Sequence, residues 1–105
     1  MNAVSVKREA TRSTWMELAE KMAEVIGQKA WVETSIYTKT VIMVYMQEGK
    51  WWFGMPHYET VAKIVTWEGS IQVRHDKVET LKGVIEAFAQ EYETTVKILD
   101  VDKVE

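Results

Sequence analysis

The chain has 105 residues, of which 47% are hydrophobic and 28% charged, and its formal net charge at pH 7 is -3. This length fits one domain with a single core, and the composition is that of a globular rather than a disordered protein. The absence of cysteine excludes disulfides, thiolate catalysis and cysteine-ligated zinc. The acidic balance argues against nucleic acid as a partner, and no apolar run is long enough to span a membrane, so we expect a soluble cytoplasmic protein.

Residues 1–11 are predicted to form an N-terminal arm that precedes an amphipathic helix. In the segment STWMELAEKMAEVIG (13–27), the apolar side chains recur at helical spacing. Thr14 followed by Glu17 has the spacing of a capping box, which satisfies free backbone N–H groups at the start of a helix. Gly27 tolerates the left-handed conformation that often ends one. We therefore predict a helix that is capped by Thr14 and ends at Gly27.

Strands are predicted next, because the apolar period changes from helical to alternating. AWVETSIY (30–37) alternates between an apolar and a more polar face. TVIMVYM (40–46) is apolar on both faces, which is typical of a strand that is covered on both sides. QEGK (47–50) has the composition of a tight hairpin turn, so WWFGM (51–55) is interpreted as the returning strand.

The segment YETVAKIVTW (58–67) is rich in β-branched residues, which favours a strand, although a helical turn near Glu59 remains open. IQVRH (71–75) is a short alternating strand. Asp76 is then expected to cap a second amphipathic helix, KVETLKGVIEAFAQEYE (77–93), with Glu79 at the capping-box spacing.

A last strand, TVKILDV (95–101), closes the pattern, and residues 102–105 are an acidic tail. The order of helix, four to five strands, helix and strand predicts a single α+β domain over residues 12–101. In this domain two helices pack on one face of a mainly antiparallel sheet of about five to six strands. The other face of the sheet is then open.

An aromatic patch is predicted on this open face. If the alternate apolar residues of the first strands face the helices, their neighbours face away from them. Such a patch is larger than a monomer usually exposes, and a second copy of the chain in a homodimer is its commonest occupant. Another protein or a small ligand remains open, as does cover by a loop or by the N-terminal arm. The predicted binding residues are Trp31, Tyr37, Met43, Tyr45, Trp51 and Trp52.

An alternative site is a small-ligand pocket, or the pocket of a minor enzyme, that residues 51–58 line with His57, Tyr58 and Glu59 as polar groups. The chain has no nucleophile-elbow motif and no glycine-rich phosphate loop. Two histidines and no cysteine are too few ligands to indicate a metal site. The sequence therefore predicts no catalytic residue, no metal and no cofactor, and it favours a binding role while leaving enzyme activity undecided.

A family resemblance rests on the spacing of segments and the placement of aromatic residues. The matching segments are ELAEKMAEVIG (17–27), the strand 37–46, GKWWFG (49–54), YETVAKIVTW (58–67) and LKGVIEAFAQEY (81–92). Over roughly residues 17–98 the chain resembles a family of hypothetical reading frames of chloroplast and cyanobacterial genomes. Because the function of that family is unknown, the resemblance implies an α+β fold and no reaction or site residue.

Overall fold

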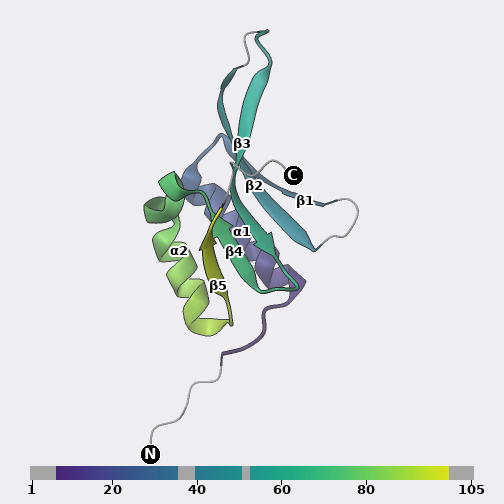
Figure 1. The fold of residues 1–105 in the computed structure, drawn as a ribbon, viewed down its shortest axis with the longest axis vertical. Helices are drawn as coiled ribbons and strands as arrows, with labels where there is room; N and C mark the ends of the chain where they lie inside the picture. Colours follow the sequence, from purple (N-terminus) through teal and green to yellow (C-terminus); the bar gives the residue numbers. More distant parts are fainter. Residues whose placement is uncertain (1–6, 36–39, 51–52, 100–105) are drawn as a thin grey trace, which may run out of the picture.

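The structure is a computed structural model that describes residues 7–35, 40–50 and 53–99. Within these ranges the chain forms two α-helices, five strands and one short 3₁₀ helix. They follow in the order α1 (Arg12–Ile26), β1 (Ala30–Thr34), β2 (Val41–Lys50), β3 (Pro56–Val65), β4 (Ser70–Val73), η1 (His75–Lys77), α2 (Val78–Glu91) and β5 (Thr95–Ile98). The sheet has the strand order β1-β2-β3-β4-β5 (Figure 1).

The sheet is antiparallel except for the parallel pair β4 and β5. The predicted α+β architecture is therefore confirmed, with strands β1–β4 as a meander and β5 added after α2. The core lies between the helices and one face of the sheet, where the strand register aligns buried residues in rows such as Val44, Ala62 and Val73. Met22 of α1 and Leu81 of α2 are fully buried in the same cluster.

The β2–β3 hairpin is longer than the sequence predicted, and it projects away from the helices (Figure 1). The predicted turn at 47–50 is wrong, because β2 continues through Gly49 to Lys50. The irregular register between Gln47 and Lys50 accommodates Gly49, whose φ is 92°. Residues 53–54 lie in the turn instead, so the predicted returning strand is wrong at Phe53 and Gly54, and its first two residues lie outside the described ranges. Pro56 begins β3 rather than ending a strand, a position where a missing N–H is tolerated.

The start of α1 also differs from the prediction. Thr11, not Thr14, is the N-cap residue: its backbone is extended and its side chain accepts a 3.3 Å hydrogen bond from the Thr14 N–H. Thr14 lies in the first turn, and its hydroxyl is 2.8 Å from that of Thr11. Gly27 ends the helix as predicted, with a φ of 129° and its N–H bonded to the Ala23 carbonyl.

Asp76 does not cap α2, because its carboxylate binds Arg74 instead. It accepts a 2.6 Å hydrogen bond from Nε and a 2.8 Å bond from Nη2 of that guanidinium. Arg74 is only 9% exposed, and it forms a further ion pair with Glu48 of β2. A bidentate, charge-assisted pair is stronger than a single bond to a helix N–H. The Arg74 network thus connects the end of β4 to the projecting hairpin.

This network predicts a pH-dependent contribution to stability. The hydrogen bonds from Arg74 hold the pKa of Asp76 below its ordinary value. A carboxyl whose pKa is lower in the folded state stabilises the fold above its unfolded pKa of about 4, and the contribution is lost as pH falls through the folded pKa. Since Asp76 is exposed, we expect Asp76→Asn to lower the free energy of unfolding at pH 7 by only about 1 kcal/mol.

Urea denaturation of the wild-type chain and of Asp76→Asn, at neutral pH and at about pH 3, measures this contribution. The difference between the two chains should shrink at the lower pH. A difference that stays the same at both pH values would show that the charge of Asp76 contributes nothing.

Candidate functional site: the aromatic face of the sheet

The side of the sheet opposite the helices carries a cluster of large side chains, because alternate strand residues point to opposite faces. In register, Trp31 of β1 lies opposite Tyr45 of β2, and Glu33 lies opposite Met43. Tyr58 of β3 joins them from the third strand. We call Trp31, Met43, Tyr45 and Tyr58 the aromatic face. Among the residues that the structure describes, neither helix covers it.

The rings of the aromatic face pack on one another. Ring centroids are 5.8 Å apart between Trp31 and Tyr45, 5.2 Å between Trp31 and Tyr58, and 5.4 Å between Tyr45 and Tyr58. The Trp31 Nε1–H donates a 2.7 Å hydrogen bond to Glu33, and the Tyr45 hydroxyl donates a 3.1 Å bond to the Met43 sulfur. These contacts hold the rings in one arrangement before any partner binds.

The Tyr45 hydroxyl, which like any ordinary phenol is neutral at physiological pH, has a pKa that its environment raises further. Burial raises the pKa of this group most, and the nearby Glu33 and Tyr58 raise it further, against a smaller lowering by a hydrogen bond with Thr60. A neutral phenol is easier to transfer out of water than a phenolate. The ring at the centre of the face is therefore suited to an apolar contact.

Two rows of side chains cross this face from β1 to β3. One row consists of Trp31, Tyr45 and Thr60, and the other of Glu33, Met43 and Lys63. The register shifts between Val44 and Tyr45, where β3 carries the extra residue Val61. This irregularity places Thr60 and Lys63, which are three residues apart, on the same face. Neither row was predicted as a unit, because nothing in the sequence marks this irregularity.

The predicted site residues fall into three groups. Trp31, Met43 and Tyr45 lie together on the side of the sheet opposite the helices, where each is half-buried. Three others lie outside the described residues: Tyr37, Trp51 and Trp52.

The residues of the alternative pocket are the third group, and they divide between the two sides of β3. Tyr58 turns onto the aromatic face. His57 and Glu59 lie on the other side of β3, where His57 Nε2 is 2.9 Å from a carboxylate oxygen of Glu59. Phe53 and Met55 stand exposed at the far end of the hairpin.

The described part of the N-terminal arm lies along the end of α2. The Arg8 N–H donates to the Glu91 carbonyl, and the Arg8 carbonyl accepts from the Glu93 N–H, at 3.0 and 2.9 Å. The Arg8 guanidinium forms an ion pair with Glu91 and lies 5.1 Å from the ring centroid of Tyr92. Because α2 is on the opposite side of the sheet, these contacts hold residue 8 away from the aromatic face.

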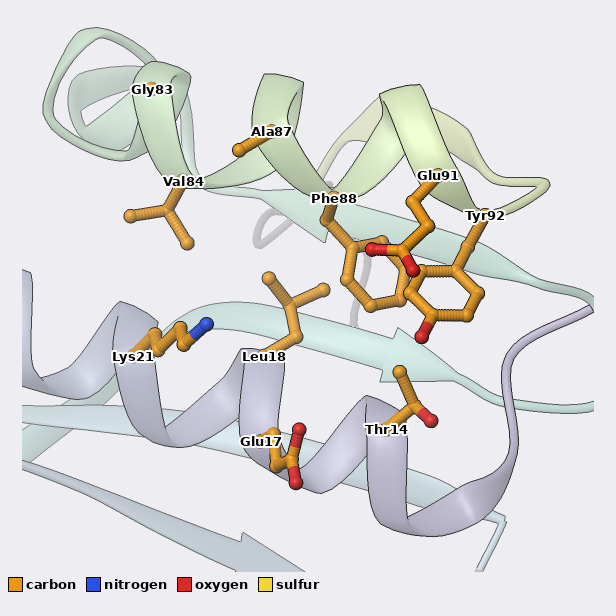
Figure 2. Close-up of a pocket in the computed structure, with 10 residues that line it drawn as sticks. All are labelled: Thr14, Glu17, Leu18, Lys21, Gly83, Val84, Ala87, Phe88, Glu91 and Tyr92. Atoms are coloured by element: carbon orange, nitrogen blue, oxygen red, sulfur yellow. The ribbon is translucent and has the colours of Figure 1, made fainter. Parts of the chain in front are cut away.

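A groove of about 480 Å³ separates α1 from α2. Figure 2 shows Leu18, Val84 and Phe88 pointing into it, with Glu17 and Lys21 along α1. Its lining residues include no histidine, serine or cysteine. The groove is lined by apolar and polar side chains alike, the charged ones being Glu17, Lys21 and Glu91.

Within the described ranges, no three histidine, aspartate or glutamate side chains are grouped closely enough to hold a metal ion. None of the helices in that part of the chain has the length and apolar character needed to cross a bilayer. The chain matches no protein-family model, no curated protein and no solved structure. The family resemblance noted in the sequence thus stays a prediction.

Proposed function

We propose that this chain is a cytoplasmic, non-enzymatic interaction module that forms a homodimer through its aromatic face. The observation that carries the proposal is the packed set of Trp31, Tyr45 and Tyr58 on the side of the sheet opposite the helices. Tyrosine and tryptophan dominate the energetics of protein interfaces, because they bury a large area for few rotatable bonds.

The packing of these rings supports a partner with an extended surface over a small flat ligand. A ligand ring inserted between two aromatic side chains needs their planes to be about 7 Å apart, twice a van der Waals contact. The ring centroids are only 5.2 to 5.8 Å apart, so the side chains fill the space between one another. A second sheet placed over the rings requires no such gap.

The order of the rings also lowers the cost of association. Immobilising a side chain at an interface costs about 0.5–1.5 kcal/mol when it is mobile beforehand. Trp31 and Tyr45 already have their polar groups bonded within the chain, to Glu33 and Met43. Burial by a partner therefore leaves neither group without a hydrogen bond.

Replacing Tyr45 with lysine is expected to dissociate the dimer. The substitution removes the central ring and would place a charge in the interface, so the dissociation constant should rise by about a hundredfold or more. Sedimentation velocity over a wide range of protein concentration measures this change, and far-UV circular dichroism checks that the fold is retained.

Gln90→Lys is the matched control, because Gln90 is exposed on α2, on the helix side of the molecule. It adds the same side chain and should leave the dimer intact. A wild-type chain that is monomeric at every concentration, or a Tyr45→Lys chain that stays dimeric, contradicts the proposal.

A further inference from the structure

We propose that the twofold axis of this dimer runs along β2, so that Glu33 of each copy contacts Lys63 of the other. The inference rests on the proposed function, and it adds which side chains meet and how the two copies are oriented. It follows from the two rows of side chains that cross the aromatic face, since β2 is the middle strand of β1–β3, which carry this face.

The position of the axis follows from the register. Strands β1 and β3 flank β2, so a twofold axis along β2 places β1 of one copy over β3 of the other. Residues in one row then face residues of the same row. Sheets packed face to face in this way keep their strands within about 30° of each other, as in aligned sheet packing.

The charges of the row that contains Glu33 fit this axis. On β1–β3 its members are Glu33, Met43 and Lys63, with a negative group on one side of β2 and a positive group on the other. Beyond β3 the same row continues to Gln72 of β4 and Lys97 of β5. The rotation brings Glu33 of each copy to Lys63 of the other, which gives two contacts of opposite charge. Met43 meets its own copy on the axis. Among the residues that the structure describes, Lys63 makes no ion pair within its own chain.

The side-chain sizes in the row that contains Trp31 fit the same axis. Trp31 is the largest side chain of the row and lies on β1, whereas the small Thr60 lies on β3. The rotation sets the Trp31 ring against Thr60 of the second copy, so a bulky group meets a small one. Tyr45, which lies on β2 like Met43, meets its own copy on the axis. Over strands β1–β3, both rows are therefore self-complementary about β2.

A charge exchange tests this arrangement. Glu33→Lys and Lys63→Glu each replace two opposite-charge contacts with two like-charge contacts, so each variant alone should show a dissociation constant about thirtyfold higher. In an equimolar mixture of the two variants, both contacts again join opposite charges. The mixture should form a heterodimer with an affinity within about threefold of the wild-type value, as native mass spectrometry or sedimentation would detect.

Two controls separate charge from other effects. Glu33→Gln keeps an oxygen that accepts from the Trp31 N–H, and it should weaken the dimer by only about fivefold. Glu20→Lys makes the same change of charge on the exposed side of α1 and should have no effect. A Glu33→Gln effect as large as that of Glu33→Lys overturns the charge pairing.

The outcomes also distinguish this inference from the proposal beneath it. If Tyr45→Lys dissociates the dimer and the charge variants do not, the aromatic face is the interface but the axis is elsewhere. If both single variants weaken the dimer and their mixture fails to form a heterodimer, Glu33 and Lys63 do not face each other and the inference is wrong. Only the recovery of dimer affinity in the mixture of the two variants supports the inference.

Discussion

Trp15→Ala should lower the free energy of unfolding by about 3–5 kcal/mol. This loss is large, because an ordinary domain has a free energy of unfolding of about 5–15 kcal/mol. Trp15 is 2% exposed and belongs to α1, and its ring centroid lies 4.8 Å from that of Phe88 of α2. The turn before β4 closes over the same ring: a Cβ on Gly69 would lie 4.0 Å from Trp15. Alanine would leave a cavity where α1, α2 and this turn meet.

Urea denaturation measures the effect, and the Tyr45→Lys chain is the appropriate background, because dimerisation would add a concentration-dependent contribution to stability. Trp67→Ala is the matched control: it is the same substitution at a residue that is 72% exposed, and it should cost less than about 0.5 kcal/mol. Equal losses in the two variants would contradict the central packing of Trp15.

The class of the fold could be predicted because it depends on the period of the apolar residues. Helical spacing over residues 13–27 and the change to a strand period after residue 30 indicate the type of each element, and the structure buries Leu18, Ile42 and Val44 in the core between the helices and the sheet. Periodicity is a property of the whole element, so errors at its ends do not change the prediction.

The ends of the elements were predicted less well, because several groups compete for the same partners there. Thr11 and Thr14 both precede the apolar stripe of α1, and only the backbone conformation decides that Thr11 is the cap. Asp76 has the correct spacing for a cap, yet its carboxylate accepts hydrogen bonds from Arg74 instead of from the helix N–H groups. Arg74 is itself held by Glu48, which is distant in the sequence. Such long-range competition has no local signal.

The aromatic face was predicted in part for the same reason. Trp31, Met43 and Tyr45 follow from simple alternation within regular strands. The sequence pattern assigns Tyr58 to a separate pocket, because it predicts the hairpin turn too early and leaves the register of β3 undetermined. The irregular register near Val61 then sets which residues of β3 accompany Tyr58. The pairing between neighbouring strands, rather than the residue pattern within one strand, determines which side chains form the rows on this face.

Leu81→Ala should be nearly as damaging to the fold as the loss of Trp15 and should leave the interface unchanged. Leu81 is 0% exposed and anchors α2 in the core cluster, so its truncation is expected to cost about 2–5 kcal/mol and to lower the melting temperature by roughly 10–25 °C. Val25→Ala is the control, because Val25 lies on α1 with 45% exposure and should lose much less.

The Leu81→Ala variant also distinguishes the role of the helix-covered face of the sheet from that of the aromatic face. Leu81 of α2 packs in the core on the helix side of the sheet, whereas the aromatic face is on the opposite side. The folded fraction of Leu81→Ala should therefore dimerise with the wild-type dissociation constant at a temperature well below its melting point. Tyr45→Lys should show the reverse: a lost dimer with helices and core intact. A dissociation constant that rises in step with the loss of stability in Leu81→Ala would mean that association depends on the core as a whole. An unchanged constant would instead assign association to side chains that the core does not use.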